Sequence, residues 1–221
     1  MKFLGLLFFS CIFNNLFFTS GLTVPYYYNP NIHNFGNIGV GGKIHAEIGP
    51  FFTKFIDNIR YDGRDIRSEI MDPYINKNKK ENKKIIDLCC GTGISTMDNN
   101  LGIDTSNEML NVARKYNKKS NFKYGNAEFF GNTNEFDIAT CMFSFHEMPN
   151  YAHYNIIENC KRIAKEEIII VDISPKYIPS KIMLSGEPYL LNYLDTIDNI
   201  LQDFEKTNYI ENRVCIWKLK L

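Results

Sequence analysis

The stretch IIDLCCGTG at residues 85–93 decides the fold, together with LGIDTSNEML at residues 101–110. Each contains a short apolar run that ends in an acidic residue, and Gly91 and Gly93 form a Gly-x-Gly turn between them. Glycine can adopt positive φ, so such a turn lets a ligand lie against bare backbone. Two strands joined through a glycine turn are typical of the first β-α-β unit of a nucleotide-binding sheet. We therefore expect a ligand site here, with Asp104 accepting both hydroxyls of a ribose.

The rest of the chain alternates apolar runs with amphipathic stretches, which predicts a mostly parallel sheet with ligands at its carboxyl edge. Residues 44–75 predict one or two helices, broken near Tyr61–Gly63. The interval before Asp104 has room for only about one and a half helical turns, at roughly 3.6 residues per turn, so the first crossover helix is predicted to be short. The other helices are expected at 106–117, 151–164 and 187–204, and the strands at 85–89, 101–104, 122–125, 136–142, 167–173 and 214–221, with a brief strand within 207–213.

Length and composition fit a single domain. The chain has 221 residues, 44% of them hydrophobic, which suffices for one sizeable core and leaves a second full domain crowded. Its 25 basic and 25 acidic residues cancel, so no global field draws it to nucleic acid. The basic loop NKNKKENKK at 76–84 has no aromatic side chains for base stacking. We interpret it as a solvated connector, with an RNA-binding patch as the alternative.

The N-terminus predicts a separate leader. Residues 1–21 have an early lysine, an apolar stretch interrupted by Asn14 and Asn15, and small residues up to Gly21, which resembles a secretory signal. Residues 22–43 contain no acid and are interpreted as a linker or transit-like segment, which leaves 44–221 as the folded domain. This predicts passage through the secretory route, with a plastid as one onward destination. An uncleaved membrane anchor and a buried helix of a cytoplasmic protein are the alternatives, and membrane association is expected only through the leader.

The cysteines do not form a disulfide framework. Of the six, five lie beyond the leader, an odd number without a C-x-x-C pair. No asparagine lies in an N-x-S/T sequon either. Both observations favour a reducing final compartment.

The motifs resemble those of class I methyltransferases that use S-adenosylmethionine. In that family the first strand ends in D-x-G-x-G-x-G, which falls here on Asp87, Cys89, Gly91 and Gly93, with Cys89 in place of the first glycine. The resemblance implies an α/β fold with a Rossmann-like seven-stranded, mostly parallel sheet, an antiparallel last strand and helices on both faces. The resemblance spans roughly residues 45–221. GNAE at 125–128 is similar to the family's adenine-contacting turn, and FDIATCMFSFHEMP at 136–149 to its fourth strand with the active-site loop. EEIIIVDISP at 166–175 is similar to its fifth strand.

The resemblance also implies S-adenosylmethionine as the cofactor and assigns roles to its site. Asp87 would fix the glycine turn and reach the methionine ammonium, while Asn126 stands where the family often has Asp and could accept from the adenine amino group. Phe143 would flank the methyl-transfer position, or be ordinary core. The cofactor-binding residues expected are Asp87, Cys89, Gly91, Gly93, Asp104, Asn126, Ala127 and Phe143.

His146 is the candidate catalytic residue. Its ordinary pKa suits proton removal from a hydroxyl or acidic carbon near neutrality, and a structural histidine is the alternative. Glu147 could orient it or cap the next turn, and His45 is interpreted as part of a lid over the cofactor. Asp172 ends the fifth strand at the ligand edge.

Competing motifs are weak. Tyr177 and Lys181 form the Y-x-x-x-K of short-chain dehydrogenases, but Pro179 prevents the helix that would align them. His146-Glu147 lacks a second histidine at metal spacing, so no metal site is expected. The sequence after the fourth strand is MFSF rather than D/N-P-P-Y/F, which disfavours nucleic-acid bases as acceptors.

The sequence thus predicts O- or C-methylation of a small, apolar or aromatic acceptor. Aromatic and apolar residues occur in two segments expected to roof the acceptor pocket, although the same stripes would suit helix packing: Phe51, Phe52 and Phe55 in one, Tyr189, Leu190 and Tyr193 in the other. The alternative, favoured by the short first helix, is a non-catalytic cofactor-binding relic with a regulatory or scaffolding role.

Overall fold

The computed structural model describes residues 24–76 and 83–221. The predicted leader at 1–21 and most of the basic loop at 76–84 lie outside these residues, so what was predicted for them stays a prediction. In chain order the elements are η1 (Tyr26–Tyr28), η2 (Ile32–Asn34), α2 (Gly39–Arg60), α3 (Ile66–Asn76), β1 (Ile85–Leu88), β2 (Leu101–Asp104), α4 (Asn107–Tyr116), β3 (Asn121–Tyr124), β4 (Phe136–Met142), η3 (Phe145–Glu147), α5 (Asn150–Ile163), β5 (Ala164–Ile173), α6 (Lys181–Gly186), α7 (Leu190–Ile200), β6 (Glu205–Ile210) and β7 (Val214–Lys220), where η marks a 3-10 helix.

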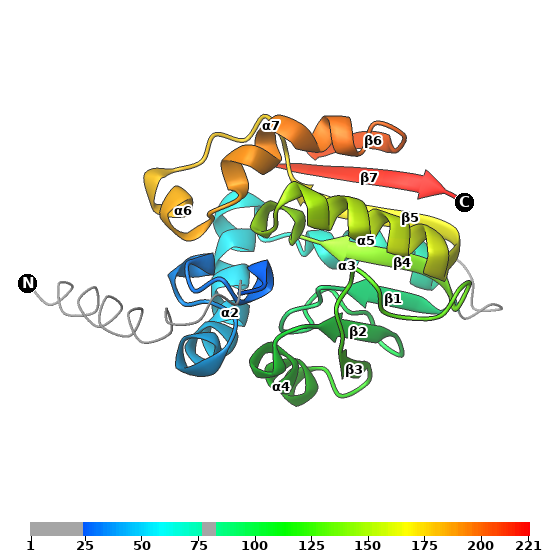
Figure 1. Ribbon diagram of the computed structural model, residues 1–221, viewed down its shortest axis with the longest axis horizontal. Helices are drawn as coiled ribbons and strands as arrows, with labels where there is room; N and C mark the ends of the chain where they lie inside the picture. The colour runs from blue at the N-terminus through cyan, green and yellow to red at the C-terminus, as the bar shows by residue number, and fades with distance from the viewer. Residues whose placement is uncertain (1–23, 77–82) are drawn as a thin grey trace, which may run out of the picture.

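The strands form a seven-stranded sheet in the order β3-β2-β1-β4-β5-β7-β6. The pairs from β3 to β5 are parallel, and β7 is antiparallel to both of its neighbours. This confirms the predicted Rossmann-like α/β fold with an antiparallel last strand. Figure 1 shows β7 pointing away from α2 and α6, which lie at the opposite end, where the parallel strands finish.

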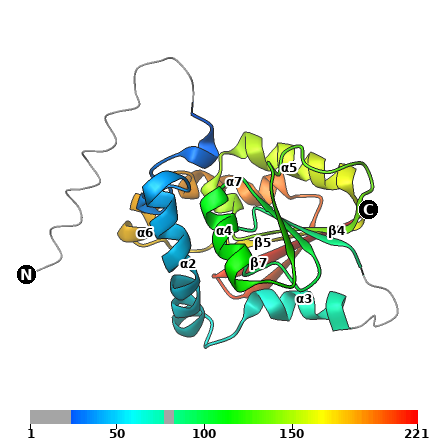
Figure 2. The same cartoon turned by 90° about the horizontal axis from the view of Figure 1, so that it is seen from below.

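Helices cover both faces of the sheet, as predicted. Side chains alternate along a strand, so neighbours in sequence face opposite layers. Ile86 belongs to a core cluster with residues of α5 and α7, whereas Ile85 packs in another cluster with Ile66 and Ile70 of α3. Figure 2 shows α3 on one side of the sheet and α5 and α7 on the other.

The first crossover differs from its prediction. Residues 91–100 form turns and bends with no helix in place of a short one. The local reason lies in Ser95 and Thr96, whose hydroxyls donate to Asp87 at the end of β1. Short hydroxyl side chains that bond elsewhere compete with helix formation. The second helix, in contrast, begins as predicted, because Ser106 caps α4 by accepting from the Met109 amide.

Two features near the C-terminus also differ. A single helix was expected at 187–204, but α7 begins only at Leu190, and Glu187–Tyr189 form a connection after the separate helix α6. Pro188 in this connection lacks the amide hydrogen that a continuous helix would need. The strand expected to be brief is β6, which has six residues, Glu205–Ile210.

The N-terminal segment belongs to the fold. The boundary drawn at residue 44 lies inside α2, which begins at Gly39. Upstream of it, Tyr28 hydrogen-bonds through its hydroxyl to that of Tyr124 on β3, at 2.9 Å, and the Asn37 carbonyl accepts from Ser106. Residues 24–43 therefore pack against the sheet edge rather than forming a free linker. The predicted break at Tyr61–Gly63 does separate α2 from α3.

Two findings bear on the chain's surroundings. Within the described ranges no helix is both long and apolar enough to cross a bilayer. Cys89, Cys90, Cys141, Cys160 and Cys215 are all free thiols.

Candidate active site

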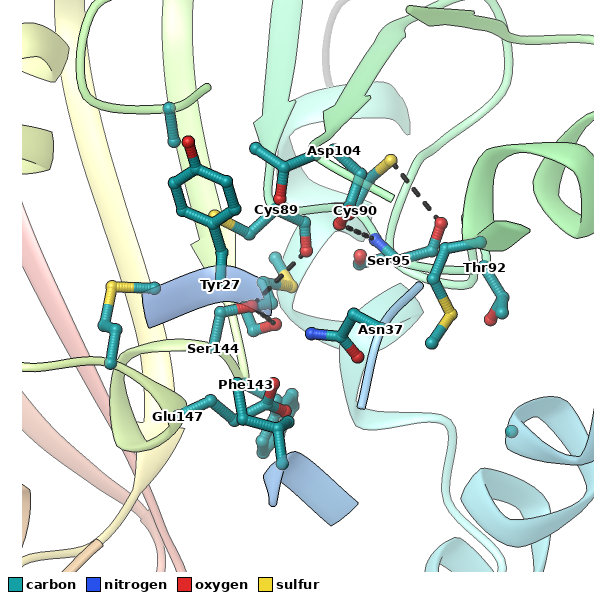
Figure 3. Close-up of a pocket in the computed structure, with 18 of the residues that line it drawn as sticks. Tyr27, Asn37, Cys89, Cys90, Thr92, Ser95, Asp104, Phe143, Ser144 and Glu147 are labelled. Carbon is teal, nitrogen blue, oxygen red and sulfur yellow. Dashed lines mark hydrogen bonds between the residues drawn. The ribbon is translucent and has the colours of Figure 1, made fainter. Parts of the chain in front are cut away.

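Two cavities lie at the carboxyl edge of the parallel strands, where the loops after β1, β2 and β4 meet the N-terminal segment. The smaller cavity, about 200 Å³, is lined by the glycine loop and by Asp104, and the larger, about 570 Å³, lies between α2 and the chain around α6. Seven residues line both and are called the shared wall: His33, His45, Gly49, Thr53, Arg67, Phe143 and Glu147. Figure 3 shows side chains of the smaller cavity converging from the sheet and from the N-terminal segment.

The glycine loop has left-handed backbone at three alternate positions. Cys89, Gly91 and Gly93 have φ of 56°, 52° and 76°. A Cβ on Gly91 would point into open space, whereas one on Gly93 would meet Phe122 and Ala113 at 2.8 and 2.9 Å. Of the two glycines only Gly91 lines the smaller cavity. Gly91 thus leaves room for a ligand, and Gly93 permits close packing behind the loop.

Asp87 lies behind the loop and outside both cavity linings. It is 2% exposed, and its carboxylate accepts from the hydroxyls of Ser95 at 2.8 Å, Thr96 at 2.6 Å and Thr140 at 3.2 Å. Burial raises its pKa, and these three donors oppose that shift. Asp87 is therefore placed to fix the glycine turn, the first of its two predicted roles. It does not line either cavity, so the structure does not place it to contact the methionine ammonium directly.

Asp104 ends β2 and lines the smaller cavity. Its Oδ2 accepts from the Gly91 amide and its Oδ1 from the Ser106 amide, both at 2.8 Å. Burial raises the pKa of this carboxyl to about 6, while the amide donors act in the opposite direction. Each carboxylate oxygen has a second lone pair, so Asp104 can still accept from a ligand.

Asn126 and Ala127 also line the smaller cavity. The Asn126 Oδ1 accepts from the Glu128 amide at 2.8 Å, which closes a local turn. The predicted residues Cys89, Gly91, Asp104, Asn126, Ala127 and Phe143 therefore meet in one place, and Asp87 and Gly93 support them from behind.

The N-terminal segment supplies cavity residues that sequence reasoning missed. Tyr26, Tyr27 and Asn37 line the smaller cavity. Figure 3 shows Tyr27 and Asn37 on this segment facing the side of Cys89 and Asp104. A signal existed, since three consecutive tyrosines at 26–28 are unusual for a linker.

The larger cavity uses few of the aromatic residues predicted for it. Phe52 lines it, but Phe51 and Phe55 are exposed, and Leu190 and Tyr193 are buried in the core. Tyr189 does not line it either. Its apolar surface comes instead from Ile48, Phe52 and Ile56 of α2 and from Tyr177, Ile182 and Met183.

His146 is held against the end of β5. Its Nδ1 lies 2.6 Å from Asp172 Oδ1, and its backbone amide donates to Oδ2 of the same residue. Burial acts to lower the pKa of His146, but the Asp172 carboxylate outweighs it and raises the pKa to about 9. An imidazole in this state is protonated at neutral pH and cannot accept a proton. The catalytic assignment of His146 stays a prediction, and this pairing favours the structural alternative.

The shared wall contains a second imidazole between two carboxylates. His33 Nε2 lies 2.8 Å from Glu147 Oε1, and its Nδ1 lies 2.7 Å from Glu187 Oε1. Burial acts to lower the pKa of His33, but the two carboxylates raise it well above its ordinary value. For Glu147, burial acts to raise the pKa, and the cation of His33 outweighs it and lowers the pKa to about 2.

His45 packs edge-on against His33, with ring centroids 4.5 Å apart, and lines both cavities. Its Nδ1 lies 3.3 Å from the Gly36 carbonyl. A carbonyl only accepts, so Nδ1 carries the proton and Nε2 keeps its lone pair. Burial, then the charge on His33, lowers the pKa of His45 to about 4.

Arg67 of α3 also belongs to the shared wall. Its guanidinium lies 4.2 Å from the centre of the Phe143 ring and 3.7 Å from Asp57. Among the described residues its Nη1 has no hydrogen-bond partner. A buried donor of this kind is available to an anionic group of a ligand.

Comparisons with known proteins agree with this geometry. Residues 85–167 match a family described as a methyltransferase domain. A search of curated proteins finds no match. Three solved structures are similar: a protein from Pyrococcus horikoshii OT3 (17% identity, 70% of this chain and 89% of that chain, TM-score 0.52), the magnesium protoporphyrin IX methyltransferase of Synechocystis PCC 6803 with bound SAH (14%, 70% and 81%, 0.52), and a SAM-dependent methyltransferase from Aquifex aeolicus (18%, 71% and 93%, 0.50).

At these identities the structures establish the fold, and the family match on 85–167 adds the activity. The sheet order and the glycine loop facing Asp104 agree with both. Residues 85–167 match a methyltransferase domain, and they lie in a fold shared with solved S-adenosylmethionine-dependent methyltransferases.

Proposed function

We propose that this enzyme transfers the methyl group to an oxygen or carbon atom of a small, apolar or aromatic acceptor held in the larger cavity. The observation that carries the proposal is the shared wall, because it joins a cavity whose lining is about half polar to a mainly apolar one at one boundary. Methyl transfer requires the acceptor in line with the sulfonium, about 3–3.5 Å from the methyl carbon. A boundary common to both cavities is where such a contact can form.

The residues of the smaller cavity fit the cofactor. Gly91 leaves open space where a side chain would otherwise project, and Asp104 has lone pairs free for ribose hydroxyls. Arg67 Nη1, which among the described residues has no hydrogen-bond partner and faces Asp57 only at 3.7 Å, would suit the carboxylate of the methionine part, because Arg67 lines the shared wall. The methionine end of the cofactor would then lie toward Phe143 and the larger cavity.

The larger cavity supports an acceptor of drug-like size and low polarity. Its volume of about 570 Å³ lies within the range of about 300–1,000 Å³ typical of small-molecule sites. Three of its lining residues, Phe52, Ile56 and Ile182, are apolar and exposed. An apolar ligand would cover them and so gain hydrophobic free energy.

For a hydroxyl acceptor, His45 is better placed than His146 to take the proton. His45 lines both cavities, and its bond to Gly36 leaves Nε2 available. His146 lines only the larger cavity, and Asp172 holds its Nδ1.

The test has a binding step and a transfer step. We expect S-adenosylmethionine and its demethylated product to bind the full chain with micromolar Kd in calorimetric titration, and Asp104→Ala to abolish this. Asp98→Ala is the matched control, since Asp98 lies in the same crossover outside both cavity linings. A screen of phenols and quinones by mass spectrometry should then find a product one methyl group heavier. Binding without transfer to any acceptor would support the relic alternative.

A further inference from the structure

Three side chains from distant parts of the chain meet at the shared wall. His33 comes from η2, Glu147 from η3, and Glu187 from the connection after α6. One potential ligand atom from each lies within 4.8 Å of the others. Imidazole nitrogen and carboxylate oxygen are both common metal ligands.

The backbone is shaped to bring these residues together. His33 has a left-handed φ of 49°, a conformation that is strained for a non-glycine residue. A Cβ on Gly186 would lie 3.3 Å from the His33 Cα and 2.8 Å from the Asn34 side chain. The absence of a side chain at Gly186 therefore lets the following Glu187 approach His33. The strained residue and the close approach thus occur at the same point, where the three side chains meet.

Glu187 has an oxygen to spare. The residue is 6% exposed, and among the described residues its Oε2 has no hydrogen-bond partner. Leaving a buried carboxylate oxygen unsatisfied destabilises the folded protein. The side chain lines the larger cavity, so a ligand in that cavity could satisfy it.

The charges at this point are also unbalanced. Glu147 and Glu187 place two carboxylates on one imidazole, so these three side chains carry a net negative charge in either protonation state of His33. Nearby, His146 is paired with Asp172. Arg67 on the shared wall is paired with Asp57 and does not compensate this charge. The cluster therefore retains a negative charge that a cation would balance.

We propose that His33, Glu147 and Glu187 bind a divalent first-row transition-metal ion, which displaces the proton from the His33 nitrogen that it binds and releases it to solvent, with its remaining coordination positions open to the larger cavity. Three protein ligands and an open side are the arrangement of metal sites that bind substrate or water. Ligand atoms around such an ion lie about 3–3.5 Å apart, given bonds of about 2.1 Å. The three side chains would thus close by about 1–2 Å, which rotations of two glutamates can provide.

The mixed donor set selects the class of ion. One imidazole with two carboxylates suits Zn²⁺ or Mn²⁺ better than Mg²⁺ or Ca²⁺, which prefer oxygen donors alone. Metal binding itself is independent of methyl transfer. Only its role, holding and acidifying an acceptor oxygen, rests on the function proposed above.

The test uses the full chain freed of metal with EDTA. Calorimetric titration with ZnCl₂ or MnCl₂ should show one site with micromolar Kd, and bound Mn²⁺ should lose its free-ion EPR signal. Glu187→Gln, which preserves shape and removes the charge, should weaken binding at least tenfold. Glu158→Gln, on the exposed part of α5, is the matched control and should bind as the wild type does. No binding at millimolar metal, or equal binding by Glu187→Gln, would overturn the proposal.

Two further measurements test the metal site without the Glu187 variant and separate it from the methyltransferase function. If Glu187→Gln does not fold, crystals of the wild type soaked in Zn²⁺ replace it: an anomalous peak between the three side chains supports the site, and its absence refutes it. Titration of the same wild-type sample with S-adenosylhomocysteine tests the methyltransferase function separately. Failure of one titration and success of the other then identifies which proposal is wrong.

Discussion

Cofactor affinity should follow the ionisation of Asp104. Burial raises the pKa of this carboxyl to about 6, and only the ionised form accepts hydrogen bonds from ribose hydroxyls at both oxygens. Affinity is therefore full above that pKa and falls as the pH drops through it. At pH 5 roughly one carboxyl in eleven is ionised, so Kd should be about 11-fold weaker than at pH 8, or about 1.4 kcal/mol.

The shared wall contributes little to this pH window. The pKa values of Glu147, about 2, and His45, about 4, lie below it. The pKa of His33 is raised well above its ordinary value, and that of neighbouring His146 to about 9. Glu147, His45 and His146 therefore keep their charge between pH 5 and pH 8 while Asp104 changes.

The assay is calorimetric titration of S-adenosylhomocysteine into the full chain at four pH values from 5 to 8, at constant ionic strength. Asp104→Asn should bind more weakly than the wild type and with no dependence on pH, because an amide does not titrate. Asp98→Asn, a substitution in the first crossover, should keep the wild-type profile. Equal wild-type affinity at pH 5 and pH 8, or a retained slope in Asp104→Asn, would refute the reasoning.

Three further outcomes are expected. Gly91→Ala should lower S-adenosylhomocysteine affinity at least tenfold and lower the free energy of unfolding by about 1 kcal/mol. Gly93→Ala should lower the free energy of unfolding further in urea, because its Cβ would meet Phe122 and Ala113. The reverse ranking would contradict the separate roles of the two glycines. The pKa of His146 is raised above its unfolded value of 6.5 to about 9, so the stabilisation that its protonated form provides is present below pH 6.5 and is lost as the pH rises through 9. Urea unfolding across this range should show a loss of up to about 3 kcal/mol in the free energy of unfolding, and Asp172→Asn should remove this loss. An unchanged pH dependence in that variant would count against the His146–Asp172 pair. Thr96→Val should lower the free energy of unfolding by about 1–2 kcal/mol, because buried Asp87 loses a hydrogen-bond donor at 2.6 Å. The control is Thr207→Val at an exposed position of β6, which should change the free energy of unfolding little.

The sequence predicted those parts of the site that lie on or next to one motif. Gly91 and Asp104 are separated by a short crossover, and the parallel pairing of β1 with β2 brings both to the same edge of the sheet. Their meeting follows from local pattern and strand direction. The same holds for Asn126 and Phe143, which follow β3 and β4, two further parallel strands of the same sheet.

The rest of the site depends on contacts between distant segments. Glu187 meets His33 across most of the chain, and neither position carries a motif. Periodicity also could not reveal that the hydroxyls of Ser95 and Thr96 would bond Asp87 instead of letting a helix form. Acid-poor composition made residues 22–43 look like a linker, although residues 24–43 pack against β3 and the start of α4.

The placement of Tyr26, Tyr27 and His33 limits where the chain can be shortened. These residues line the cavities only a short distance after residue 24, where the described part of the chain begins. If the leader predicted for residues 1–21 is cleaved, the cut must fall before Tyr26 for the cavity lining to stay complete. A cut a few residues further on would keep every strand of the sheet and remove cavity residues, so activity would be lost before the fold is.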